Sequence, residues 1–468
     1  MKLKVVIIFL LSVLILSFKL STVPNGLTID EASFGYNAVL LSRTLRDENN
    51  RFLPVFVLSI NKTDWRQPVT QYFIASIFKI GDLLGIFEPS IFVLRFTTVL
   101  VSVFSIAFIY LLGGITASLL LLMTPVFFMH SHLALDNIMP VPFILIWLYS
   151  IYKYSTNKKL SHLIVAGVAI GLGLYAYKGI RVFIPVWLLT SSIYIFLVGR
   201  WKAVLIYLLS CLPFFAVIPC LEYKYAGAVL NNEKLKFEDV YQFLFRYFSY
   251  FDPSFLFVGG DTMLIHSTGK HGMYLLAGVP LFLIGVFKSW KKDLFNKFLI
   301  ISFFAGPVLF GFFGLIHRSS KLISLVPFYI LISTAGAVWL YKNNKKIYLL
   351  IFVLIFINFA DFLNYYLFKY PDISKDVFYK IDAGMEYKVL KEISDKYKLV
   401  PYVDASKVSK SFSSGDFVRS IYFTQKPNEW NGKSIDLPLN SVVMTDNQNI
   451  KDLKKLDYRY NNYLFYQK

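Results

Sequence analysis

Long uncharged stretches of apolar residues recur along most of this 468-residue chain. Residues 96–129 contain no charged side chain, and 203–221, 298–316 and 322–341 are each near the length of about 20 residues that a helix needs to cross a bilayer. The pattern predicts a mainly α, polytopic helical membrane protein. Composition agrees, because only 16% of the residues are charged, against about 25% in average soluble domains.

Positively charged residues gather in the short connections between the apolar runs. Five of these connections together carry fourteen lysines and arginines but a single acidic residue, Asp293. Loops of this kind are cytoplasmic by the positive-inside rule. The formal net charge of +19 therefore reflects membrane topology, and no nucleic-acid partner is expected.

The alternation of basic and non-basic connections predicts about eleven transmembrane helices and a cytoplasmic N-terminus. The first span is expected to stay uncleaved, since no small-x-small site follows it. Segment 67–84 carries four polar side chains at helical spacing, so we expect it to lie in the membrane interface rather than to cross. The uncharged Gly113-Gly114 connection then becomes cytoplasmic. The predicted spans are 5–20, 91–112, 115–130, 138–152, 162–177, 182–198, 203–220, 273–287, 298–315, 322–340 and 347–367.

The last hundred residues differ from the rest, because charge becomes frequent and apolar runs become short. We therefore predict a transmembrane domain over 1–368, with outside loops 21–66 and 221–272, and a small extracytoplasmic α/β domain over 369–468. In the latter, helices are expected at 386–398 and 450–456, and extended segments at 399–403, 418–424, 441–445 and 458–466. Neither cysteine lies in these hydrophilic segments, so no disulfide framework is expected.

Two adjacent carboxylates, Asp30 and Glu31, follow the first span closely. Carboxylates at a membrane face are costly to bury and suited to acid–base chemistry on a substrate held at the lipid surface. The alternative is a helix N-terminus, where carboxylates are favoured. Residues 30–45 suit an interfacial helix that would hold both groups against the membrane. For Asp47 and Glu48, further along the same loop, a solvated loop is the competing interpretation.

A series of motifs follows in order along residues 28–385. It comprises Asp30-Glu31-Ala32 with Phe34-Gly35-Tyr36-Asn37-Ala38, Arg46-Asp47-Glu48, Arg66-Gln67-Pro68, His130-Ser131-His132-Leu133-Ala134-Leu135-Asp136, Tyr175-Ala176-Tyr177-Lys178-Gly179-Ile180-Arg181, Phe251-Asp252-Pro253 and His317-Arg318-Ser319-Ser320. The series resembles GT-C membrane glycosyltransferases, most closely the protein O-mannosyltransferase and aminoarabinose-transferase-like group. This chain has Gln67 where the group commonly has His or Lys, so Arg66 is expected to substitute as the cation there.

The resemblance implies transfer of a sugar from a polyprenyl-phosphate donor to an acceptor on the extracytoplasmic face of the cell membrane. Asp30 is the expected general base, and Glu31 would orient the acceptor or assist. The leaving phosphate needs cations. The expected phosphate-binding residues are Arg66, Lys178, Arg181, Arg318 and Lys321. The expected substrate-orienting residues are Asp136, Asp47 and Glu48.

Other interpretations stay open at this point. Basic side chains at span ends commonly reach toward lipid head groups instead of binding a substrate. A transporter or flippase of lipid-linked sugars would usually show broken helices, midplane charges and internal repeats, which this sequence lacks. No metal or other cofactor is assigned: His130 and His132 face different ways on a helix, and lone histidines at interfaces more often form hydrogen bonds. The sequence does not name the sugar, the acceptor (lipid, glycan or protein), the metal dependence or the oligomeric state.

Overall fold

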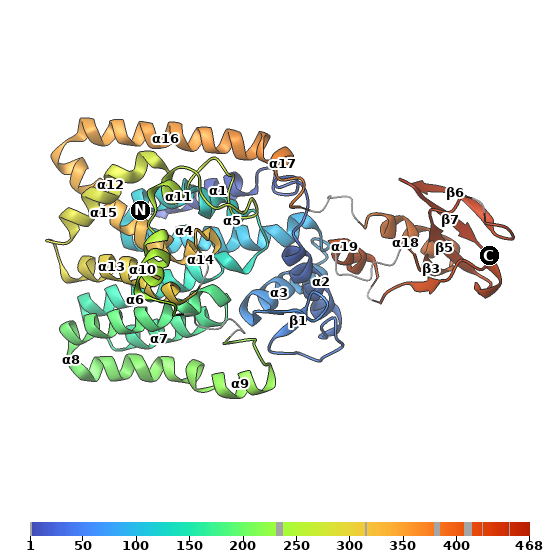
Figure 1. Ribbon diagram of the computed structural model, residues 1–468, viewed down its shortest axis with the longest axis horizontal. Coiled ribbons are helices and arrows are strands. Elements are labelled where there is room, and N and C mark those ends of the chain that lie inside the picture. Colours follow the sequence, from blue (N-terminus) through green and yellow to red (C-terminus); the bar gives the residue numbers. More distant parts are fainter. Residues whose placement is uncertain are drawn as a thin grey trace. The chain divides into compact units, whose positions relative to one another are not determined.

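The computed structural model describes residues 2–230, 237–313, 316–378, 384–406, 414–423, 425–448 and 450–468. The protein is mainly helical (Figure 1). Its contacts divide it into two compact units, each described by itself below. The first comprises Met1–Pro24, Gln67–Thr70 and Arg95–Ser374, and the second comprises Asn25–Arg66, Gln71–Leu94 and Lys375–Lys468. Parts of the predicted ranges 221–272, 298–315, 369–468 and 418–424 lie outside the described residues.

The first unit is built from helices, most of which run alongside one another as horizontal ribbons in Figure 1. A described helical segment coincides with each of the eleven predicted spans. The α-helices are α1 (Lys2–Ser17), α4 (Ile91–Leu122), α5 (Pro125–Ser131), α6 (Pro140–Asn157), α7 (Ser161–Leu174), α8 (Ile184–Ala216), α9 (Ile218–Lys224), α10 (Val240–Ser249), α11 (Pro253–Phe257), α12 (Val279–Ser289), α13 (Leu294–Ala305), α14 (Ser319–Leu322), α15 (Val326–Asn343), α16 (Lys345–Phe368) and α17 (Tyr370–Ile373). The 3₁₀ segments are η1 (Asp136–Ile138), η2 (Lys178–Val182), η3 (Leu276–Gly278), η4 (Gly306–Phe312) and η5 (Ile323–Leu325).

Helix α4 is a hairpin of two helices joined at Gly114. In a straight helix, Ser118 and Ile106 would be separated by about 18 Å along the axis. Here the Ser118 hydroxyl donates to the Ile106 carbonyl at 3.0 Å, so the chain reverses between them. Gly114 has φ 66° and ψ −161°, a conformation that glycine adopts without a side-chain clash. The predicted connection between two spans is therefore a tight turn.

Helix α8 reverses in the same way at Arg200, which has φ 64°. The Ser191 hydroxyl donates to the Tyr207 hydroxyl at 3.1 Å, although these residues are sixteen positions apart. A straight helix would separate them by about 24 Å. The predicted spans 182–198 and 203–220 are thus two antiparallel segments.

The uncharged turn at Gly113 lies at the same end of the first unit as the basic connections. Gly113 lines a pocket together with Lys158, Lys288 and Lys342. This position of the turn agrees with the prediction of an odd number of membrane crossings between the first outside loop and Gly113. Segment 67–84 forms one helix, α3 (Pro68–Leu84), and its assignment to the membrane interface stays a prediction.

Membrane-spanning capacity is clear from helix length and composition. Among the described residues, five helical stretches are long and apolar enough to cross a bilayer: Ile91–Leu122, Ile184–Lys224, Leu294–Phe312, Ser319–Asn343 and Lys345–Phe368. The first two contain the hairpin turns at Gly114 and Arg200. Shorter apolar helices cover Val6–Ser17, Ser161–Leu174 and Leu276–Ser289. The chain is therefore a multi-pass membrane protein, while the exact number of crossings and the cytoplasmic side of the N-terminus stay predictions.

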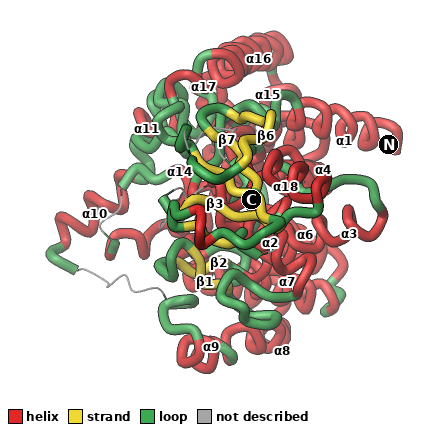
Figure 2. The backbone as a smooth tube through the Cα atoms, turned by 90° about the vertical axis from the view of Figure 1, so that its right-hand side faces the viewer, coloured by secondary structure: helices red, strands yellow, loops and turns green. Residues whose placement is uncertain are grey.

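The second unit joins most of the first outside loop to the C-terminal residues, and all described strands belong to it (Figure 2). From the loop come α2 (Ile29–Thr44), β1 (Val57–Ser59), β2 (Asp64–Arg66) and most of α3. The C-terminal part contributes α18 (Glu386–Tyr397), β3 (Val400–Asp404), α19 (Ser414–Tyr422), β4 (Asn428–Trp430), η6 (Ser434–Asp436), β5 (Ser441–Thr445), β6 (Lys454–Tyr460) and β7 (Tyr463–Gln467). The small C-terminal α/β domain is confirmed.

The C-terminal strands form one mixed sheet in the order β4-β3-β5-β7-β6. Strand β3 pairs in parallel with β4 and β5, and β7 pairs antiparallel with β5 and β6. Leu390 and Ile393 of α18 pack on one group of strand residues that includes Val403 and Phe465. Trp430 belongs to a second buried group, so apolar side chains alternate between two sides of the sheet.

Two predicted C-terminal elements are wrong. Segment 418–424 was expected to be a strand, but α19 includes its first five residues, because Phe417, Val418 and Ile421 recur at helical spacing. Segment 450–456 was expected to be a helix, but its end belongs to β6, which forms a hairpin with β7. The turn between these strands contains Asn461 at φ 50°, a residue that tolerates the left-handed conformation.

Candidate active site

Glu31 fixes the beginning of helix α2. Its carboxylate accepts a hydrogen bond from the backbone N–H of Thr28 at 3.0 Å, and the Thr28 hydroxyl accepts one from the Glu31 N–H at 3.1 Å. This capping box satisfies two donors that a helix end leaves unpaired. Glu31 is fully buried, so its observed contacts orient the helix. A catalytic role for Glu31 stays a prediction.

Asp30, the next residue toward the N-terminus, forms an ion pair with Arg66. The Arg66 Nη2 atom lies 2.8 Å from Asp30 Oδ1 and 3.3 Å from Asp64 Oδ2. The Arg66 side chain is 4% exposed, whereas that of Asp30 is 45% exposed. The Arg66 guanidinium also stacks 5.0 Å from the centre of the Phe34 ring. The fold thus brings a predicted base and a predicted phosphate-binding cation together, with the carboxylate of Asp30 still accessible.

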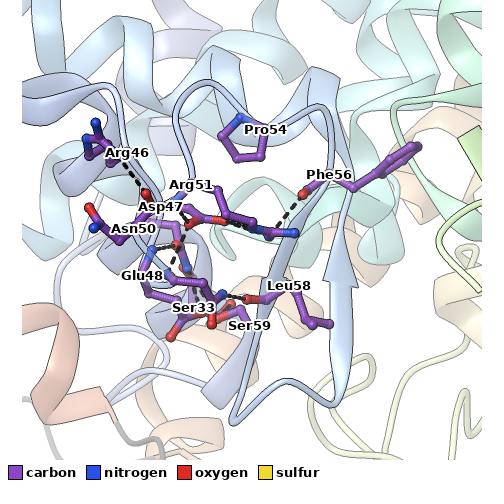
Figure 3. A network of polar contacts seen from close by, with 12 residues as sticks. Ser33, Arg46, Asp47, Glu48, Asn50, Arg51, Pro54, Phe56, Leu58 and Ser59 are labelled. Atoms are coloured by element: carbon purple, nitrogen blue, oxygen red, sulfur yellow. Dashed lines mark hydrogen bonds and ion pairs between the residues drawn. The ribbon is translucent and has the colours of Figure 1, made fainter. Parts of the chain in front are cut away.

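Asp47 organises the loop that follows α2 (Figure 3). Its Oδ1 atom accepts the backbone N–H groups of Asn49 and Arg51, at 3.0 and 2.9 Å. Its Oδ2 atom accepts two hydrogen bonds from the Arg51 guanidinium, at 2.8 and 2.6 Å. The Asp47 side chain is fully shielded from solvent. These contacts shape the loop, and the predicted substrate-orienting role of Asp47 stays a prediction.

Glu48 belongs to a polar network beneath α2. The Asn37 side-chain amide donates to Glu48 Oε1 at 3.1 Å and accepts the Glu48 backbone N–H at 3.0 Å. The same amide donates to the Ser59 hydroxyl at 3.2 Å, and the Ser33 hydroxyl donates to Ser59 at 2.7 Å (Figure 3). Burial raises the pKa of the Glu48 carboxyl, although hydrogen bonds from Ser59 and Asn37 oppose the shift.

The raised pKa of Glu48 predicts a pH-dependent cost of folding. The folded state binds this proton more tightly than the unfolded state, so stability contributed by the neutral carboxyl is lost as pH rises from the ordinary value of 4.5 through the folded pKa. The Glu48→Gln variant should remove this loss, since an amide keeps the shape and can still accept from Asn37. Measuring the melting temperatures of wild type and the variant across that pH range checks this prediction. An equal change of melting temperature with pH in both proteins would contradict the raised pKa of Glu48.

Helix α19 packs against α2 within the second unit. The Arg43 guanidinium, near the end of α2, donates to the backbone carbonyls of Ser420 and Ile421 at 3.0 and 2.9 Å. Arg419 stacks 5.4 Å from the centre of the Tyr36 ring. The C-terminal domain therefore helps to hold the helix whose first turn carries Asp30. Sequence reasoning missed this contact, because the partners are nearly four hundred residues apart and share no local pattern.

The α2–α19 contact leaves no room for a side chain at Gly35. An added Cβ atom would lie 2.6 Å from Phe417 Cδ2 and 3.0 Å from a Leu94 methyl. We expect Gly35→Ala to lower the free energy of unfolding by about 1–3 kcal/mol through overpacking. Adding Phe417→Leu should recover part of that loss. Thermal unfolding of the purified single and double variants measures it, and an unchanged Gly35→Ala protein would contradict this packing.

In the first unit, three of the predicted phosphate-binding cations line one cavity of about 600 Å³. These are Lys178, Arg181 and Lys321. The rest of the wall is largely apolar and comes from the ends of several helices: Leu174, Gly179, Val182, Ile184, Pro185, Phe215, Ile218, Val229, Leu230, Leu309, Phe310, Phe312 and Phe313. An apolar cavity with a few convergent charges is the usual form of a small-molecule site. This one suits an apolar ligand with an anionic group.

Arg181 is held in position by its neighbours. Its guanidinium donates to the carbonyls of Leu174 at 3.0 Å, Ala228 at 2.9 Å and Val229 at 2.6 Å, and to the side-chain oxygen of Gln67. Gln67 is fully buried. Gln67, where this chain departs from the pattern of the group that it resembles, therefore positions the side chain of Arg181, a predicted phosphate-binding residue. Gln67 itself carries no charge.

Other predicted residues lie around the same cavity or beside it. The Lys321 ammonium stacks 5.5 Å from the centre of the Tyr177 ring, and Asp136 is close enough to act electrostatically on both Tyr177 and Arg181. Arg318 does not line the cavity. Its Nη1 atom lies 3.6 Å from Asp261 Oδ1, and Asp261 also accepts the backbone N–H of Ser319. The sequence motif assigned no role to Tyr177, and its contact with Lys321 was not predicted.

Of the two histidines weighed as metal ligands, His130 pairs with another histidine, whereas His132 Nδ1 lies 3.4 Å from the carbonyl oxygen of Val23. His130 Nε2 and His266 Nδ1 lie 3.2 Å apart with stacked rings, and His317 Nε2 lies 3.1 Å from Asp252 Oδ2. Within the described parts of the chain, no group of three or more His, Cys, Asp or Glu side chains could hold a metal ion.

Comparison with known proteins adds independent information. Residues 66–223 match the family model described as dolichyl-phosphate-mannose-protein mannosyltransferase, a range that contains Arg66, Asp136, Lys178 and Arg181. The fold is similar to that of ArnT from Cupriavidus metallidurans in the apo state, with 12% identity and TM-score 0.55 over 90% of this chain and 84% of that one. The form bound to undecaprenyl phosphate gives 10% identity and TM-score 0.58 over 98% and 97%. No curated protein gives a significant match.

Proposed function

We propose that this chain transfers a sugar from a polyprenyl-phosphate donor. It has the GT-C membrane glycosyltransferase fold of the ArnT and protein mannosyltransferase type, which its motifs implied. The acceptor receives the sugar on the extracytoplasmic face. The observation that carries the proposal is the apolar cavity lined by Lys178, Arg181 and Lys321. Its walls suit an isoprenoid tail, and its cations suit the phosphate that leaves during transfer.

The chemistry of the proposed transfer is a single displacement. An acceptor hydroxyl attacks the anomeric carbon and loses its proton to the Asp30 carboxylate. The bond between that carbon and the phosphate oxygen breaks, and the polyprenyl phosphate leaves with the electron pair. Arg181 and Lys321 would stabilise the negative charge that grows on the leaving oxygen. Lys178 would contribute to the same charge.

Two features of the second unit support Asp30 as the base. Its carboxylate is accessible, whereas Glu31 and Asp47 are enclosed by their own hydrogen bonds. Arg66 also holds it in a fixed direction, and a base must be positioned to be effective. Arg66 would in addition contribute positive charge near the donor, and Glu48 would orient the substrate from its position in the Asn37 network. We propose no metal role.

The experiment that tests this function compares envelope lipids, glycans and proteins by mass spectrometry in cells with and without the chain. We expect one sugar-modified acceptor to disappear when the protein is absent, while its polyprenyl-phosphate donor accumulates. The mass difference would name the sugar class, hexose or pentose, and the acceptor. Identical acceptor profiles together with unchanged donor levels would contradict the proposed function.

A further inference from the structure

A second pocket lies at the other end of the first unit, where the basic connections meet. It has a volume of about 1010 Å³ and opens between the turns of the α4 and α8 hairpins and the adjoining ends of α6, α12, α13 and α15. The cavity with Lys178 and Arg181 is lined instead by helix ends and connections on the side that was predicted to lie outside. The two pockets therefore belong to opposite sides of the membrane in the predicted topology.

The lining of this pocket combines apolar walls with lysine side chains. The apolar and aromatic part includes Tyr152, Tyr194, Phe295, Leu299, Val338 and Trp339. Five lysines contribute their side chains: Lys158, Lys288, Lys291, Lys292 and Lys342. A pocket of this composition suits an amphiphile with an anionic head, because the stems and rings contact acyl chains while the ammonium groups contact the head.

The positive charges in the pocket outnumber the negative charge that the protein places there. Asp293 is its single acidic lining residue, and its carboxylate accepts hydrogen bonds from the backbone and side-chain amides of Asn296 at the start of α13. The ammonium groups of Lys291, Lys292 and Lys342 form no hydrogen bond or ion pair with the residues that the structure describes. A net positive pocket with exposed ammonium groups is therefore available to an anion.

Two further lysines are placed by the pocket walls. Lys288 stacks 4.6 Å from the centre of the Trp339 ring, and Lys158 donates to the carbonyl of Val198 at 3.2 Å. Tryptophan and tyrosine favour the membrane–water interface, so Trp339 places the mouth of the pocket at head-group depth. The cytoplasmic leaflet carries the anionic lipids that lysine clusters attract.

We propose that this pocket binds one anionic phospholipid of the cytoplasmic leaflet, with its phosphodiester head between Lys291, Lys292 and Lys342. Its acyl chains lie against the apolar wall formed by Phe295, Leu299 and Val338. The site is separate from the proposed donor cavity, so the assignment stands or falls independently of sugar transfer.

Native mass spectrometry of the purified full-length protein tests the proposal with dioleoyl phosphatidylglycerol and dioleoyl phosphatidylcholine as probes. Wild-type protein should retain one phosphatidylglycerol more tightly than phosphatidylcholine. The variant Lys291→Gln/Lys292→Gln/Lys342→Gln should bind phosphatidylglycerol about tenfold or more weakly, since each lysine near an anionic head group adds attraction. All three lysines are exposed, so their replacement should cost little stability.

The matched control is Lys159→Gln/Lys345→Gln/Lys346→Gln. It removes the same charge from exposed positions in basic connections predicted to lie on the same side of the membrane, and none of these residues lines the pocket. This control should bind phosphatidylglycerol as wild type does. Equal losses in both triple variants, or equal retention of the two lipids by wild type, would overturn the site. Displacement of the lipid by millimolar inorganic phosphate would overturn the choice of a lipid as its occupant.

Discussion

Replacing Asp30 by Asn is expected to reduce sugar transfer by about 10²–10⁴-fold, the usual contribution of a general base. The amide keeps the size of the side chain and can still accept a hydrogen bond from Arg66, but it cannot take a proton from the acceptor. The loss should appear in the rate of product formation by the purified variant at saturating donor. Protein level and thermal stability should stay close to those of wild type, because Asp30 is partly exposed.

The matched control for this variant is Asp64→Asn. Asp64 is the other carboxylate on Arg66, at 3.3 Å, and its side chain is 39% exposed. Both substitutions therefore remove one negative charge from the same arginine, but only Asp30 is proposed to act as a base. The control should retain most of the activity. Full activity in Asp30→Asn would remove Asp30 from the mechanism, and an equal loss in both variants would limit its role to positioning Arg66.

The second large effect is expected for the double variant Lys178→Gln/Lys321→Gln. Both residues line the proposed donor cavity, and removing one preorganised hydrogen-bond donor to a developing negative charge commonly costs about 10²–10³ in rate. We expect a loss of at least about 10²-fold in turnover together with weaker binding of polyprenyl phosphate. Arg181 is left in place because its guanidinium supports four oxygen atoms of the protein, so its removal would disturb folding.

The control for the lysine pair is Lys224→Gln/Lys369→Gln. These two lysines are exposed, are predicted to lie on the same side of the membrane, and do not line the cavity. Isothermal titration of polyprenyl phosphate into each purified protein separates binding from turnover. Unchanged binding of polyprenyl phosphate by the Lys178→Gln/Lys321→Gln variant would show that this cavity does not bind the phosphate of the donor.

Much of the architecture could be predicted from the sequence because membrane helices are encoded by local composition. Uncharged runs and basic connections located a helix at each of the eleven predicted spans, and the Gly113-Gly114 pair marked the turn of a hairpin. The ArnT-like fold was implied by the order of motifs and is confirmed. Helix α2 was also predictable, since Thr28 and Glu31 have the spacing of a capping box.

Contacts between distant segments could not be predicted in this way. Arg181 and Gln67 are 114 residues apart, and nothing near either one indicates the other. Arg95 is fully buried in α4 and donates hydrogen bonds to the carbonyls of Leu20 and Pro24. No sequence pattern near Arg95 indicates these partners. The strand predicted at 418–424 failed although the helical spacing of Phe417, Val418 and Ile421 was a local signal, and Arg43 of α2, far away in sequence, adds hydrogen bonds to the last turn of that helix.

The most direct test of the central claim is a proteoliposome assay with purified protein, a polyprenyl-phosphate sugar and membrane extract as the source of acceptor. Mass spectrometry then follows both the donor and its products. The proposed transfer predicts that free polyprenyl phosphate and a glycosylated acceptor appear in equal amounts with wild-type protein, and that both form about 10²–10⁴-fold more slowly with Asp30→Asn. Movement of intact donor across the bilayer without release of polyprenyl phosphate would contradict the proposal and indicate a flippase.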